Sequence, residues 1–193
     1  GSIPIAILAG CAIGLINGLL VAKAKISSFI VTLGMLTILQ GAIYTITRGN
    51  SISLSSPDAF AVSDWLSKML IPLITPRVVI TLILVAAFTV FLRFTRVGRN
   101  LYMVGGNRQT AWLAGINTDL YTIMTFVISG FTAAVGGVLF AMEGAAATLN
   151  LGDTSLMYVI SAVIIGGTAM SGGKGGVLKS FFAILSLDVL YNG

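Results

Sequence analysis

Charged residues are scarce in this chain of 193 amino acids. Asp, Glu, Lys and Arg together make up 9% of the sequence, whereas a soluble domain is usually about a quarter charged. Apolar residues make up 56%, and the mean hydropathy is +1.02. Such a chain has too little polar surface to cover a water-soluble globule, so lipid is its expected solvent. The sequence therefore predicts an all-α, polytopic membrane protein with a single transmembrane domain over residues 1–193.

Histidine is absent, and Cys11 is the only cysteine. These absences exclude disulfide frameworks, zinc sites and acid–base chemistry that depends on histidine. The only carboxylates that approach a place inside the apolar runs are Glu143 and Asp188, and each lies near the end of its run. We therefore predict no catalytic, cofactor-binding or metal-binding residue, and an intramembrane enzyme has little support.

Six apolar runs separate the more polar segments of the chain. They are Ile3–Val21, Phe29–Thr47, Val78–Phe94, Leu120–Met142, Leu156–Met170 and Val177–Tyr191. The first four approach the length of about 20 residues that crosses a hydrocarbon core. The last two are shorter and are joined by a glycine-rich turn, so they form either two spans or a re-entrant hairpin. We favour two spans, which gives about six transmembrane helices.

The basic residues indicate the orientation of these spans. If all six runs cross, the loops at Lys23–Lys25, Arg93–Arg108 and Lys174–Lys179 share one side and carry 8 of the 11 basic residues. The positive-inside rule then places these three loops in the cytoplasm. The net charge of +5 does not indicate a nucleic-acid partner, because the basic residues lie between long apolar runs.

Small residues and polar residues both recur within the runs. Gly10, Gly14 and Gly18 in the first run, and Ala133, Gly137, Ala141 and Ala145 in the fourth, are spaced four apart and predict close helix packing. Interhelical hydrogen bonding is the default explanation for the polar residues, and contact with a polar solute is the alternative. The residues that we consider for a solute pathway are Asn17, Thr32, Gln40, Ser161 and Thr168.

The segment between the third and fourth runs has a defined start and end. Gly105-Gly106 predicts a turn, Asn107 can cap a short helix, and Gly115 can close that helix after Ala114. The helix would present Ala111, Trp112 and Leu113 at the cytoplasmic surface. A short helix of this kind suits a groove in a partner protein, and a solvated loop is the alternative.

The same segment carries a specific resemblance. Gly98-Arg99-x-x-Tyr102-x-x-Gly105-Gly106-Asn107 resembles the cytoplasmic loop of the ribose/xylose/galactoside-type permeases of ATP-binding-cassette (ABC) importers. GLINGLLVAKAK (Gly14–Lys25), FIVTLG (Phe29–Gly34) and VIIGGTAMSGGKGG (Val163–Gly176) are similar to the same family in the same order. Members of that family usually have further spans before and after the region that this chain resembles, so we expect a fragment of a larger permease.

The resemblance implies a transport function and its partners. We expect a permease subunit that moves a sugar of the ribose-like monosaccharide class across the bacterial cytoplasmic (inner) membrane, without catalytic chemistry of its own. The implied partners are an ATPase subunit, an external (periplasmic) sugar-binding protein and a second permease subunit, in a homo- or heterodimer. The residues implied for coupling to the ATPase are Gly98, Arg99, Gly105, Gly106, Asn107, Ala111 and Gly115.

Two further observations bear on the source of energy. The turn at Ser171–Gly176 does not match a phosphate-binding P-loop, since Thr168 replaces the first glycine and Gly175 the hydroxyl residue after the lysine. ATP hydrolysis is therefore expected on another polypeptide. The alternative function is an ion- or proton-coupled secondary transporter or channel, which the lack of a carboxylate in the middle of any run disfavours.

Overall fold

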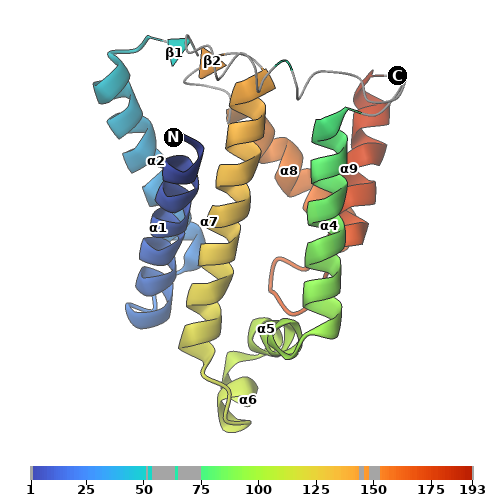
Figure 1. Ribbon diagram of the computed structural model, residues 1–193. Helices are drawn as coiled ribbons and strands as arrows, with labels where there is room; N and C mark the ends of the chain where they lie inside the picture. Colours follow the sequence, from blue (N-terminus) through green and yellow to red (C-terminus); the bar gives the residue numbers. More distant parts are fainter. Residues whose placement is uncertain are drawn as a thin grey trace. The chain divides into compact units, whose positions relative to one another are not determined.

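The computed structural model describes residues 2–50, 52–53, 64, 75–143, 146–147 and 153–192. Helices dominate it, together with one pair of two-residue strands (Figure 1). The helices are α1 (Ser2–Lys23), α2 (Ser28–Thr47), α4 (Pro76–Phe94), α5 (Arg96–Gly106), α6 (Arg108–Leu113), α7 (Thr118–Glu143), α8 (Asp153–Ile165) and α9 (Val177–Asn192). Strand β1 (Ile52–Ser53) pairs antiparallel with β2 (Ala146–Ala147).

The chain divides into two compact units. The first comprises residues 1–78 and 119–149 and contains α1, α2, α7 and the strand pair. The second comprises residues 79–118 and 150–193 and contains nearly all of α4 together with α5, α6, α8 and α9. Each unit is described by itself below.

The first four predicted spans are confirmed as helices. Within the described residues, α1, α2, α4 and α7 are long and apolar enough to cross a membrane. Helix α4 begins at Pro76, two residues before the predicted start. Proline suits the first position of a helix because the amide hydrogen it lacks would have no partner there. The chain is therefore a polytopic helical membrane protein.

Helices α8 and α9 form an antiparallel pair within the second unit. The hydroxyl of Tyr158 in α8 donates a hydrogen bond of 3.0 Å to the Oδ1 atom of Asp188 in α9. Helix α8 has 13 residues and α9 has 16 residues, which correspond to about 20 and 24 Å. Both lengths are below the hydrocarbon thickness of about 30 Å. Neither helix is therefore long enough to cross the hydrocarbon core by itself.

Helix α8 ends at Ile165, five residues before the predicted end of the fifth run at Met170. The chain leaves the helix through Gly166 and Gly167, and Gly167 has a φ of +77°. Residues with a side chain rarely adopt this left-handed conformation. The run was predicted from hydropathy alone, which does not register this change of backbone direction.

Helices α1 and α7 pack closely through glycine in the first unit. A Cβ atom added to Gly10 would lie 2.5 Å from the Cβ of Ala134, and one added to Gly14 would overlap the carbonyl oxygen of Phe126. The predicted close packing of the first span is therefore confirmed. The α7 glycine at this contact is Gly130, whose added Cβ would overlap the carbonyl oxygen of Gly10. Gly137, from the predicted α7 series, has no described atom within 4 Å of such a Cβ.

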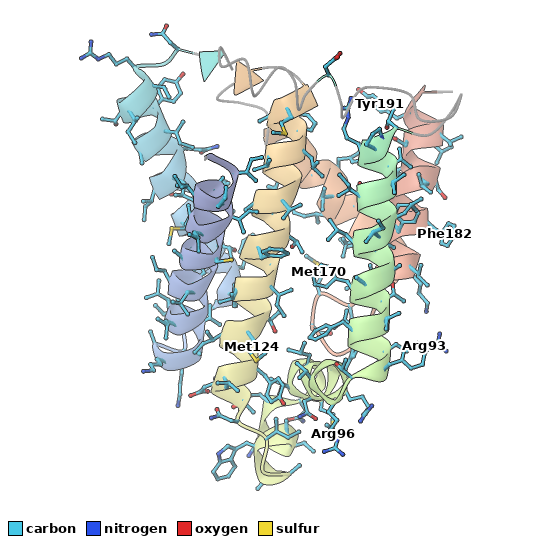
Figure 2. The ribbon with its side chains drawn as sticks, viewed as in Figure 1. Arg93, Arg96, Met124, Met170, Phe182 and Tyr191 are labelled. Carbon is cyan, nitrogen blue, oxygen red and sulfur yellow. The ribbon has the colours of Figure 1, made fainter. Side chains whose placement is uncertain are left out.

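Large apolar side chains remain exposed on the outer faces of the long helices. Ile46 of α2 is 80% exposed and Phe94 of α4 is 68% exposed. Phe182 and Tyr191 project from α9 in the same way (Figure 2). Exposure on this scale suits a lipid environment, in which apolar side chains need no burial within the protein.

Candidate functional site

The candidate site is the segment that follows α4, built from α5 and α6. We call residues 96–116 the docking segment. Thr95 directly precedes it, and its Oγ1 accepts a hydrogen bond of 3.0 Å from the amide of Gly98 and donates one of 2.6 Å to the carbonyl of Phe91. Thr95 therefore caps α5 and ties its first turn to the last turn of α4. The sequence prediction missed this residue, although a threonine before a short helical run is a recognisable capping signal.

Gly98 is buried at this corner between α4 and α5. A Cβ atom added there would run into the backbone of Leu92, against both its carbonyl oxygen and its Cα. Only glycine leaves room for the two helices to approach this closely. Gly98 was predicted as a coupling residue, and the structure gives it a defined position as the packing point of the corner.

Arginine side chains surround the corner and point outward. Arg93 and Arg96 extend away from α4 and α5 (Figure 2). The guanidinium of Arg93 lies 5.8 Å from the ring centroid of Phe94, a cation–π arrangement. Arg99 is also exposed, and its Nη1 lies 3.5 Å from the carbonyl oxygen of Phe94. These positive charges are available to acidic groups of a partner or to lipid phosphates.

The predicted turn at Gly105-Gly106 is wrong, because both glycines belong to the last turn of α5. The amide of Asn107 donates a hydrogen bond of 3.1 Å to the carbonyl of Met103 and keeps this turn closed. The chain changes direction one residue later, at Asn107, where the backbone is extended. The glycines instead allow a close approach by another part of the chain, described below.

Asn107 caps α6, as predicted from the sequence. Its Oδ1 accepts hydrogen bonds of 3.0 Å from the amides of Gln109 and Thr110. These are two of the amide groups that a helix leaves unpaired at its start. The Asn107 side chain therefore stabilises the start of α6 directly after α5.

Helix α6 is also closed at its C-terminal end. Gly115 has a φ of +78°, its amide donates to the carbonyl of Trp112 at 2.9 Å, and the amide of Ile116 donates to the carbonyl of Ala111 at 3.1 Å. This pair of bonds is the Schellman motif, in which glycine is the favoured residue. The predicted closure of the helix at Gly115 is confirmed, although α6 ends at Leu113 and Ala114 follows as its cap. The coupling role of Gly115 stays a prediction.

The surface of α6 differs from the prediction at one position. Ala111 was expected at the surface but is buried, with 3% exposure. Its neighbours Trp112 and Leu113 are 67% and 73% exposed. In the six residues of α6, Ala111 therefore lies on the inward side, while the next two positions face outward. The docking segment thus presents two large apolar side chains on α6 and exposed arginines on α5.

Replacing Asn107 with alanine should loosen α6 without disturbing the membrane helices. Loss of an N-cap typically reduces helix stability by about 1 kcal/mol, so the amides of residues 109–114 should exchange hydrogen about fivefold faster. Hydrogen exchange followed by mass spectrometry would measure this change. Asn107→Asp is the matched control, because its carboxylate can still accept both bonds. Equal exchange in the alanine variant and the wild type would show that the cap does not hold α6.

Residues 166–176 connect α8 to α9, and we call them the glycine-rich loop. Within the second unit this loop contacts α5. The hydroxyl of Tyr102 donates a hydrogen bond of 3.1 Å to the carbonyl of Gly175, and a Cβ added to Gly105 would lie 2.8 Å from the amide nitrogen of Gly173. The segment after α4 and the loop after α8 therefore lie at the same end of the helices of the second unit. The distribution of basic residues predicted the same side of the membrane for these two loops.

The five predicted pathway residues have different environments. Thr32 and Ser161 use their hydroxyls within their own helices, donating to the carbonyls of Ser28 at 2.9 Å and of Met157 at 2.8 Å. The Oγ1 of Thr168, in the glycine-rich loop, lies 3.3 Å from the Oγ of Ser180. Asn17 of α1 is buried, and its Oδ1 has no hydrogen-bond partner among the described residues. Gln40 lies half-buried in α2. The pathway role of all five residues stays a prediction.

The long apolar helices define the chain as a polytopic helical membrane protein, and the capped helices α5 and α6 lie between α4 and α7 in its sequence. A family model described as "Branched-chain amino acid transport system / permease component" matches residues 1–192. The match covers nearly the whole chain, so the chain belongs to this permease family.

Several curated proteins of sugar transport are similar to the chain. The ribose import permease protein of Haemophilus influenzae is 32% identical over 193 residues, which cover 98% of this chain and 59% of the relative. The D-allose transport system permease protein of Escherichia coli is 33% identical over 187 residues, covering 97% of this chain and 56% of the relative. The galactofuranose transporter permease protein of Escherichia coli is 34% identical over 197 residues, covering 100% and 57%.

These relatives confirm the resemblance to sugar permeases of ABC importers. The chain spans less than two thirds of the length of each of the three. No solved structure matches the chain significantly.

Proposed function

We propose that the chain forms part of the membrane-spanning permease subunit of an ATP-driven sugar importer in the bacterial cytoplasmic membrane. The observation that carries this proposal is the docking segment, a helix pair fixed by caps at Thr95 and Asn107 that exposes Trp112 and Leu113. A six-residue helix is too short to be stable alone. A helix that is nevertheless capped at both ends and exposes apolar residues is suited to a groove in another protein.

The proposed importer requires three partners for this chain. An ATPase subunit would bind the docking segment and hydrolyse ATP, because the chain itself contains no P-loop. A periplasmic binding protein would deliver the sugar to the opposite face, and a second permease subunit would complete the pathway. The exposed Arg93, Arg96 and Arg99 would pair with acidic groups of the ATPase or with lipid phosphates.

The substrate class comes from the relatives. Their names specify ribose, D-allose and galactofuranose, so we propose a monosaccharide of the ribose-like class. Hydroxyl and amide side chains suit a sugar because they can donate and accept hydrogen bonds without carrying charge. Asn17 and Thr168 are the first candidates for such contacts, since the Oδ1 of Asn17 is buried without a described partner and Thr168 lies in a glycine-rich loop.

The source of energy tests the proposal. The complete transporter would be reconstituted in proteoliposomes with its ATPase, with ATP enclosed and the binding protein and labelled ribose outside. We expect uptake that requires ATP and continues after a protonophore removes the proton gradient. Uptake that stops with the protonophore at constant ATP would instead support the ion- or proton-coupled carrier.

A further inference from the structure

The glycine-rich loop has a shape that depends on glycine. Gly167, Gly172, Gly173 and Gly175 all have positive φ angles, of +77°, +88°, +73° and +149°. Such angles are strained for residues with a side chain. The loop between α8 and α9 therefore has a defined backbone conformation that requires glycine at these positions.

On one side the loop packs directly on the end of α5. A Cβ added to Gly172 would lie 2.5 Å from the carbonyl oxygen of Gly105, and one added to Gly173 would run into the backbone of Gly106. The backbones of the two segments are thus in contact, with no side chain between them. The hydrogen bond of 3.1 Å from Tyr102 to the carbonyl of Gly175 adds a second attachment one turn earlier in α5.

On its other side the loop packs on α9. A Cβ added to Gly175 would lie 2.7 Å from the Oγ1 of Thr168, and this Oγ1 lies 3.3 Å from the Oγ of Ser180 in the first turn of α9. A Cβ added to Gly166, directly after α8, would lie 2.8 Å from the Cα of Ser180. The loop, the start of α9 and the end of α8 are therefore in tight contact with one another.

We propose that the glycine-rich loop transmits motion of the docking segment to the α8–α9 pair, with Tyr102, Gly105, Gly172 and Gly173 as positioning residues. The inference rests on the proposed function, since it assumes an ATPase that moves α5 and α6. Close-packed backbones pass on a displacement because there is no soft side chain to absorb it. A shift at the end of α5 would therefore displace the loop and, with it, Thr168 and the first turn of α9.

The test uses the complete transporter in proteoliposomes and compares three quantities: ATPase binding, ATP hydrolysis, and sugar imported per ATP hydrolysed. In Gly173→Ala the added methyl group would push the loop away from α5, so import per ATP should fall about five- to tenfold. Tyr102→Phe removes only the hydroxyl and should lower this ratio about two- to fivefold. ATPase binding should stay at the wild-type level in both variants, because Gly173 lies outside the docking segment and the hydroxyl of Tyr102 is directed at the glycine-rich loop.

Met170→Ala is the matched control, because Met170 lies in the same loop but is 79% exposed. It should keep the wild-type ratio. If Gly173→Ala does not assemble, the amount of sugar imported per ATP in Tyr102→Phe tests the proposal. A wild-type ratio in Tyr102→Phe, or equal losses of uptake and hydrolysis in both variants, would overturn the transmission role while leaving the importer itself intact. Absence of ATP-driven uptake in the wild type would refute both the importer and the inference.

Discussion

Alanine in place of Gly98 is expected to lower the Tm of the permease and to remove most of its ATP-driven uptake. The added methyl group would meet the backbone of Leu92 in the last turn of α4. Backbone atoms of a packed helix cannot rotate out of the way, so the corner between α4 and α5 must open. Overpacking of this kind typically destabilises by about 1–3 kcal/mol, which shifts the ratio of the closed to the opened corner about 5- to 150-fold toward the opened form.

Gly41→Ala in α2 is the control for Gly98→Ala. Gly41 has no described atom within 4 Å of an added Cβ, and alanine favours a helix over glycine by roughly 0.5–1 kcal/mol. The Tm of this variant in detergent should therefore stay equal or rise, while that of Gly98→Ala falls. Normal uptake by Gly98→Ala would show that transport does not need the closed corner.

The double substitution Trp112→Ala with Leu113→Ala should weaken ATPase binding while leaving the fold intact. Both side chains are largely exposed, so their removal takes away little internal packing. Tryptophan is enriched among residues whose truncation reduces binding by 2 kcal/mol or more, and a loss of that size corresponds to about 30-fold weaker affinity. The affinity of the purified ATPase for the detergent-solubilised permease measures the effect directly.

Phe140→Ala serves as the control for this double variant. Phe140 is also exposed and apolar, but it lies near the end of α7 and outside the docking segment. Its removal should change neither the affinity for the ATPase nor the Tm. An unchanged affinity in the Trp112/Leu113 variant would show that the ATPase does not bind through these side chains of α6.

Local patterns in the sequence were enough to predict the four long helices and the caps of α6, whereas α5 was not predicted. Helices α1, α2, α4 and α7 are apolar along their whole length because lipid surrounds them. This apolar composition can be recognised in the sequence without knowledge of tertiary contacts. Asn107 and Gly115 were also predictable, because a cap is a property of neighbouring residues. The prediction of a turn at Gly105-Gly106 failed because glycine serves both turns and close approaches, and sequence alone does not distinguish them.

Contacts between distant parts of the chain were not predictable. The hydrogen bond from Tyr102 to Gly175 joins residues 73 positions apart, and nothing in either local pattern specifies the other. Burial of Ala111 was missed for the same reason, since the inward side of a six-residue helix depends on what it packs against. The glycines of the 166–176 loop predicted a turn between two apolar runs, but their contact with α5 is visible only in the three-dimensional structure.

The two caps of α6 also affect how quickly a partner can bind. An uncapped helix of six residues would be largely unfolded in water and would lose conformational entropy on binding. With Asn107 at one end and the Gly115 motif at the other, that entropy is lost when the permease itself folds. Binding then requires no folding step, so the association rate should be set by diffusion and orientation. Under the proposed function, an ATPase subunit would therefore meet α6 as an already folded helix.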